Sequence, residues 1–63
     1  MLLYATSRDA AEAVVRALRA RGVEAAGGNP RHGNYPVSVM VADDRGAEVL
    51  DIAKAVDPAI QVG

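Results

Sequence analysis

The residue types that form disulfide bonds, metal sites and base-stacking surfaces are absent or scarce in these 63 residues. There is no cysteine, so the chain can form neither a disulfide nor a thiolate metal site. The single histidine, His32, is too few for a histidine-based zinc site. Phenylalanine and tryptophan are absent and only two tyrosines are present, whereas RNA-binding sheets stack bases on two or three aromatic residues. These absences predict a domain that binds no metal ion or cofactor and no RNA.

The sequence also has no large excess of charge of either sign and no long apolar run. Seven basic and eight acidic residues are interspersed and give a net charge of −1, whereas nucleic-acid binders usually carry a basic excess. No apolar run approaches the length of about 18 residues that a membrane helix needs, and no charged segment opens a signal peptide. We therefore expect no nucleic-acid or membrane partner and a cytoplasmic location. Arginine outnumbers lysine six to one, which suggests a GC-rich genome, such as that of an actinobacterium or one of its bacteriophages.

The length allows one domain, residues 1–63. A chain this short buries only about 60% of the surface that it exposes when unfolded. Small domains without disulfides or metals often gain stability by oligomerisation, so we expect a homodimer or another homo-oligomer.

The first half of the chain predicts a strand, a helix and a second strand. Met1–Ala5 is a short apolar run suited to a strand. Thr6 or Ser7 can cap a helix over 8–21, which Gly22 ends in the left-handed conformation. One face of this helix is apolar, with the helical spacing of Ala11, Val14, Val15 and Leu18. Residues 23–26 predict a weak strand.

The second half repeats this order. Residues 37–42 alternate, with Val37, Val39 and Val41 on one face. Asp43 or Asp44 can cap a helix over 47–56, which the Asp57-Pro58 pair ends because a residue before proline avoids helical geometry. Residues 59–62 predict a short last strand. The order β-α-β-β-α-β predicts an α+β fold, the split βαβ arrangement of ferredoxin-like domains, with both helices on one face of an antiparallel sheet.

At this level the sequence resembles a small bacterial family described as signal-transducing proteins, a domain of unknown function. The resemblance rests on Glu12-Ala13, Leu18, residues 22–25 and the valine-rich strand, followed by Asp43-Asp44 and residues 47–50. It covers most of the chain and implies the ferredoxin-like fold. It carries no catalytic residue across, and residues 27–36 match no motif of that family.

The stretch GGNPRHGNYP, residues 27–36, has two interpretations. Its polar residues could clamp an anion or a peptide end; these are Asn29, Arg31, His32, Asn34 and Tyr35. The alternative is a solvent-exposed hairpin loop, because Asn-Pro and Gly-Asn dipeptides are turn signals. The glycine spacing matches no dinucleotide or phosphate-binding motif.

Other candidate sites are weaker. Asp43, Asp44 and Glu48 could hold a hard cation, but their spacing is not that of a calcium loop and helix capping is the better explanation of the aspartates. No Ser-His-Asp or Cys-His set is recognisable, so we expect no enzymatic activity.

The uncovered sheet face is the remaining candidate. If Leu3 and the alternating valines face the helices, the other face carries Leu2, Tyr4, Met40 and Ala42, and such apolar patches mark association surfaces. The alternative is a register shifted by one residue, in which this apolar face is the core. The sequence thus favours a small non-enzymatic interaction module that self-associates, with a protein partner that it does not identify. The alternative is a regulatory domain that binds a small ligand or anion through residues 27–36.

Overall fold

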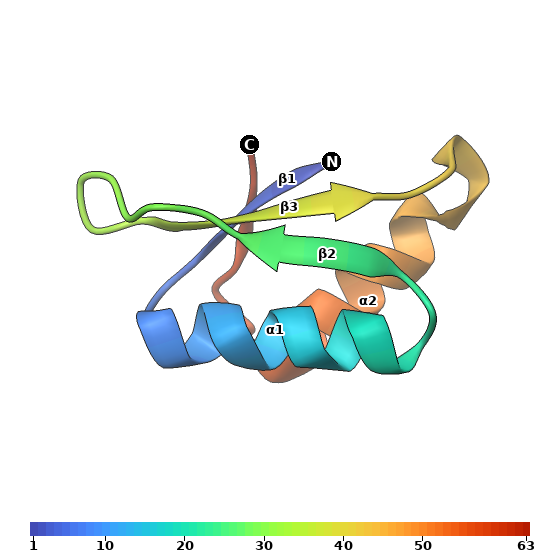
Figure 1. The fold of residues 1–63 in the computed structure, drawn as a ribbon, viewed down its shortest axis with the longest axis horizontal. Coiled ribbons are helices and arrows are strands. Elements are labelled where there is room, and N and C mark those ends of the chain that lie inside the picture. Colours follow the sequence, from blue (N-terminus) through green and yellow to red (C-terminus); the bar gives the residue numbers. More distant parts are fainter.

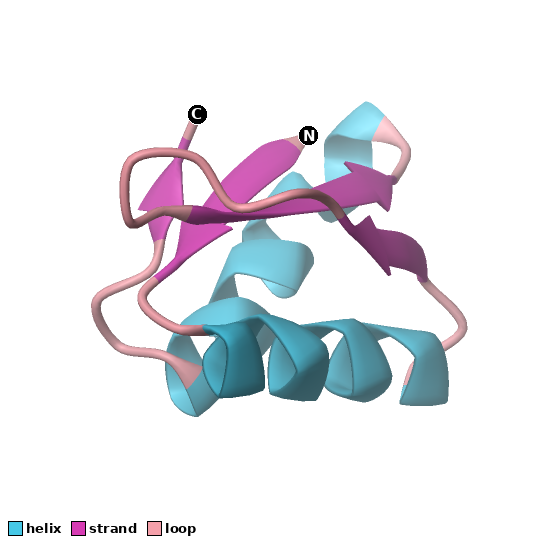
Figure 2. Ribbon diagram, turned by 60° about the vertical axis from the view of Figure 1, so that its left-hand side comes forward, coloured by secondary structure: helices cyan, strands magenta, loops and turns pink.

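The computed structural model describes residues 1–63, apart from the side chain of Asp43. The elements follow the predicted order: β1 (Leu2–Ala5), α1 (Arg8–Ala20), β2 (Glu24–Gly27), β3 (Tyr35–Met40), the 3-10 turn η1 (Asp43–Arg45), α2 (Gly46–Val56) and β4 (Gln61–Val62). The strands form one sheet in the order β2-β3-β1-β4, and neighbouring strands are antiparallel. Both helices lie on the same side of this sheet (Figures 1 and 2). The predicted ferredoxin-like α+β fold is confirmed.

Helix α1 begins and ends as the sequence predicts. The Ser7 hydroxyl accepts a hydrogen bond from the backbone N–H of Ala10 at 3.1 Å, which satisfies one free donor of the first turn. At the other end Gly22 has a φ of 76°, in the left-handed region that glycine adopts without strain. The predicted apolar face is buried.

Strand β3 lies two residues earlier than predicted, over Tyr35–Met40 instead of 37–42. It ends at Met40 because its partner in β2, Glu24, is the first residue of that strand. It includes Pro36, which has no N–H to donate, because the missing donor falls opposite Gly28, just beyond the end of β2. Strand β2 is shifted in the opposite direction, by one residue, to Glu24–Gly27 instead of 23–26.

The start of α2 differs from the prediction as well. Its N-cap is Arg45, whose side chain makes no capping hydrogen bond, so the predicted cap by Asp43 or Asp44 is wrong. The chain enters through η1 instead, with the N–H of Arg45 donating to the carbonyl of Ala42 at 2.9 Å. The helix ends at Val56, as expected before Asp57-Pro58. Val49 and Ala53 are buried beneath the sheet, whereas Val56 is 37% exposed.

The core lies between the sheet and the two helices. Its largest fully buried side chains come from both halves of the chain: Leu3, Val14, Leu18, Val37 and Val49. Leu3 and Val37 are paired across β1 and β3, and both point toward the helices. The alternative register is therefore wrong, because a shift of one residue would turn Leu3 and Val37 to solvent.

A buried carboxylate joins the two halves of the fold. Asp57, which is 5% exposed, follows α2, and its Oδ2 accepts hydrogen bonds from the backbone N–H and the hydroxyl of Thr6 at 2.8 and 2.9 Å. Its Oδ1 accepts a third from the N–H of Ala59 at 3.2 Å. The N–H of Ile60 donates to the carbonyl of Asp57, so Pro58 and Ala59 form a turn and β4 covers only Gln61–Val62.

Candidate association face and arginine cleft

The sheet side that no helix covers carries an apolar strip across its two central strands. Residues that alternate with the buried ones point to this side. We define the association face by six of them: Leu2, Tyr4, Ala26, Pro36, Ser38 and Met40. Leu2, Tyr4 and Pro36 are partly exposed, and Met40 is 72% exposed, the most of any large hydrophobic side chain described.

Small and paired residues surround these side chains. Leu2 lies opposite Ser38, which in turn pairs with Ala26 of β2. Small side chains therefore lie next to Leu2 in the middle of the face. Tyr4 lies opposite Pro36 on one side and Gln61 on the other. Its ring packs against Gly63, where any side chain would collide with it. The face therefore presents the large side chains of Leu2, Tyr4 and Met40 beside the small side chains of Ser38 and Ala26.

Of the four residues that the sequence places on this face, three are there. Leu2, Tyr4 and Met40 occupy alternate positions of β1 and β3. Ala42 does not, because β3 ends two residues earlier; Ala42 is exposed in the connection to η1. Pro36 also lies on this face, which the sequence does not predict, because residues 27–36 have the composition of a loop.

Residues 27–36 form an extended hairpin. Arg31 and Asn34 exchange two backbone hydrogen bonds of 2.9 Å around His32 and Gly33. These central residues have φ angles of 52° and 77°, as in a type I′ turn, which suits the twist of a hairpin. The tip extends past the start of α1 (Figure 1). Asn29, Arg31, His32 and Asn34 are all exposed, and Tyr35 is partly buried at the start of β3.

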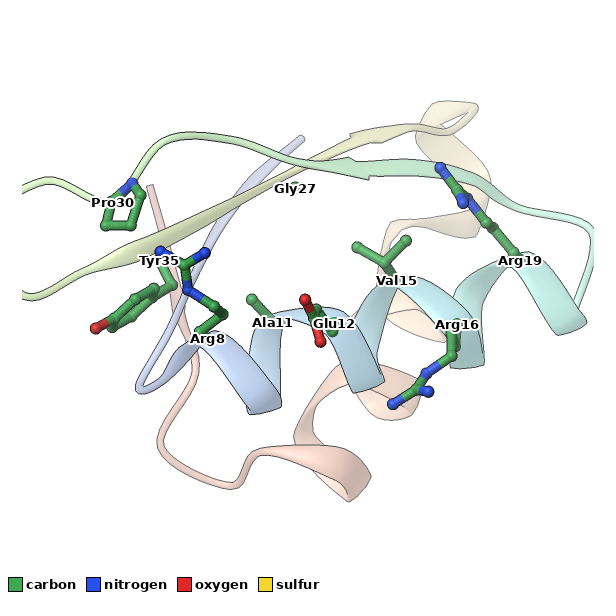
Figure 3. A pocket seen from close by; sticks show the side chains of 9 residues that line it. All are labelled: Arg8, Ala11, Glu12, Val15, Arg16, Arg19, Gly27, Pro30 and Tyr35. Carbon is green, nitrogen blue, oxygen red and sulfur yellow. The ribbon is translucent and has the colours of Figure 1, made fainter.

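A cleft of about 400 Å³ lies between α1 and the β2–β3 hairpin. We call it the arginine cleft, because its rim carries Arg8, Arg16 and Arg19. Its other lining residues are Ala11, Glu12, Val15, Gly27, Pro30 and Tyr35. Tyr35 is thus the one residue of the proposed loop clamp that lines the cleft. Figure 3 shows Arg8 and Arg19 reaching up from α1 toward the hairpin side, with Arg16 pointing away from β2.

The cleft is locally basic in a chain of net charge −1. Its lining includes three arginines and one acidic residue, Glu12, and none of the three arginines forms a salt bridge among the described side chains. Arg19 is held in place by a hydrogen bond from its Nε to the backbone carbonyl of Ala25, at 2.9 Å. The floor of the cleft is apolar, because Ala11 and Val15 belong to the core. Such a cleft suits a ligand with both anionic and apolar groups.

The proposed cation site is not assembled by the described residues. Glu48 instead forms an exposed ion pair with Arg45, with 3.2 Å between Oε2 and Nε. The hydrogen bond and charge of Arg45 hold the pKa of Glu48 below its usual value. The side chain of Asp43 lies outside the described part, and the described His, Asp and Glu residues form no group of three that could hold a metal ion.

Among the described residues, no helix has the length and apolarity to cross a bilayer. The sequence matches no protein-family model, and comparisons with curated proteins and with solved structures give no significant match. The likeness to the signal-transducing family stays a prediction. Functional inference for this chain therefore depends on the association face and the arginine cleft.

Proposed function

We propose that this chain is a non-enzymatic protein-interaction module that self-associates through the association face. The observation that carries the proposal is the side chain of Met40, 72% exposed on a sheet face that also presents Leu2 and Tyr4. Three large apolar side chains on one uncovered face favour burial against another surface. A second copy can provide it, because two-fold symmetry brings the same patch onto itself.

Size supports the same conclusion. The folded chain exposes 4064 Å², and a standard interface buries roughly 800 Å² on each partner, about one fifth of that surface. Since a core in this size range rarely supplies more than about 3–5 kcal/mol, burial of the association face would add substantially to stability. Folding and association should therefore be coupled, so the midpoint of thermal unfolding should rise with protein concentration.

We also propose that the chain has no enzymatic activity, because of where its buried carboxylate and its histidine lie. Asp57 is the buried carboxylate of the described chain, and its oxygens accept three hydrogen bonds from Thr6 and Ala59. His32 lies in the exposed hairpin tip. These surroundings offer neither group a reacting partner.

The test is Met40→Lys, with Ala55→Lys on the exposed surface of α2 as the matched control. Met40 pairs with Glu24 across β2 and β3, so a lysine there gains an opposite charge and should not weaken the monomer. In a dimer it would bury a charge within the interface, which is strongly unfavourable.

Light scattering after size exclusion, at about 100 µM protein, should give twice the monomer mass of 6.5 kDa for the wild type and for Ala55→Lys. Met40→Lys should elute as a folded monomer. A monomeric wild type at that concentration would disprove self-association, and a dimeric Met40→Lys would show that another surface mediates it.

A further inference from the structure

We propose that the arginine cleft binds a short, extended acidic peptide segment, which adds as a further strand to the free edge of β2. This site is distinct from the association face, which lies on the opposite side of the sheet. Both can therefore be occupied at once, and the two proposals can fail independently.

The hydrogen-bond pattern of β3 shows which of its residues bond to β1. The N-terminal nitrogen of Met1 donates to the carbonyl of Val39 at 2.9 Å, and the N–H of Val39 donates back to Met1 at 2.8 Å. Because hydrogen-bonded pairs alternate in an antiparallel ladder, the odd-numbered residues of β3 bond toward β1. Its even-numbered residues therefore bond toward β2.

The same alternation fixes the free edge of β2. The N–H of Gly28 donates to the carbonyl of Pro36 at 2.9 Å, so the even-numbered residues of β2 point at β3. Ala25 and Gly27 consequently direct their backbone groups outward, and β2 is the last strand of the sheet on that side. The carbonyl of Ala25 already accepts from Nε of Arg19, so the groups open to an added strand are the N–H of Ala25 and the N–H and carbonyl of Gly27. An unpaired strand edge is the surface to which an extended peptide adds.

The cleft beside this edge has the length of a peptide strand. Arg8 and Arg19 are eleven residues apart on α1, which corresponds to about 16 Å along the helix axis. An extended segment of about five residues covers that distance at roughly 3.3 Å per residue. Inorganic phosphate or a single carboxylate could reach one of these arginines, whereas a strand with an acidic residue toward each end could reach both.

The side chains lining the cleft define what that segment should carry. Alternate residues of an added strand would face α1, where Ala11 and Val15 offer an apolar floor between the two arginines. Arg19 uses Nε to hold Ala25, which leaves both Nη groups as donors for a carboxylate. The pattern acidic-x-apolar-x-acidic therefore fits the cleft, with the acidic residues four apart and on the same face of the strand.

The probe is a fluorescein-labelled seven-residue peptide with Asp at its second and sixth positions and Val at the fourth. Its counterpart carries Asn in place of both Asp residues. Binding is measured by fluorescence anisotropy, and the amide resonances of the ¹⁵N-labelled chain show where the peptide lies. We expect the Asp peptide to shift the amides of Ala25 and Gly27, and the Asn peptide to bind more weakly.

Two variants separate the edge from the charge. Gly27→Pro removes an outward N–H where an added Cβ meets nothing within 4 Å, so β2 should persist while peptide affinity falls about tenfold. Arg8→Gln should weaken binding about two- to five-fold, as expected for loss of one exposed ion pair, and Arg8→Lys should restore most of it. Arg31→Gln, at the hairpin tip outside the cleft, is the control.

Three outcomes would overturn this proposal: equal binding of the Asp and Asn peptides, unchanged affinity in a folded Gly27→Pro protein, or shifts that inorganic phosphate alone reproduces without peptide binding. If Gly27→Pro does not fold, the comparison of Arg8→Gln with Arg31→Gln decides the charge component, and the Ala25 and Gly27 amide shifts in the wild type decide the edge. Failure of these tests would leave the mass of the Met40→Lys protein unaffected.

Discussion

Replacement of Asp57 by alanine should be among the most damaging single changes outside the apolar core. The substitution leaves three donors without their acceptor, two on Thr6 and the N–H of Ala59. A hydrogen bond to a charged group contributes about 1.5–3 kcal/mol, and removal of the buried charge returns part of that sum. Because Thr6 is exposed, water can replace part of what it loses. We expect a loss of about 2–4 kcal/mol in the free energy of unfolding.

That loss is a large share of what so small a domain possesses. Urea unfolding followed by circular dichroism, at one fixed protein concentration, measures it. Asp51→Ala on the exposed side of α2 is the control and should stay within about 0.5 kcal/mol of the wild type. If Asp57→Ala unfolds at the same urea concentration as Asp51→Ala, Asp57 does not join the two halves energetically.

The same carboxylate predicts how stability depends on pH. Burial by itself would raise the pKa of Asp57, but the hydrogen bonds from Thr6 and Ala59 outweigh it and hold the pKa below its usual value. A carboxyl whose pKa is lower in the folded state stabilises fully above its unfolded pKa, about 3.9. This contribution is lost as the pH falls through the folded pKa. The stability difference between the wild type and Asp57→Asn should therefore be constant near neutrality and shrink below about pH 4. A difference that is unchanged in acid would contradict this assignment.

Two further predictions concern left-handed residues. Gly22→Ala should lower the free energy of unfolding by about 1 kcal/mol in urea titrations, because the φ of 76° after α1 is strained for any residue with a Cβ; an unchanged midpoint would refute this. His32→Asn converts the hairpin tip to Asn-Gly, the preferred pair for a type I′ turn, and should leave the thermal midpoint unchanged or higher. A lower midpoint would mean that the His32 side chain contributes contacts beyond the turn.

Local patterns were sufficient for the order of the elements and for three of the four residues predicted on the sheet face. The 3.6-residue period of α1, a cap at Thr6 or Ser7 and the Gly22 stop depend on neighbours within a turn or two, so they can be predicted without tertiary structure. The alternation around Val37 and Val39 likewise predicted which side of β3 is buried, and Leu2, Tyr4 and Met40 followed from it. That Tyr35 would lie beside α1 could not be predicted, because the contact joins residues far apart in the chain.

The strand ends, the role of Asp57 and the arginine cleft depend on residues far apart in the chain, so only the tertiary structure determines them. Strand ends were misplaced because they depend on where the neighbouring strand begins: β3 ends at Met40 opposite the first residue of β2, and this removes Ala42 from the association face. In the sequence Asp57 is recognisable only as part of a helix stop. Its structural role depends on two hydrogen-bond donors of Thr6, which is 51 residues away. The arginine cleft exists because a helix face that looks merely solvated lies beside a free strand edge. Short-range periodicity predicts which face of an element is buried, but it does not predict which distant residues lie beside that element in the folded chain.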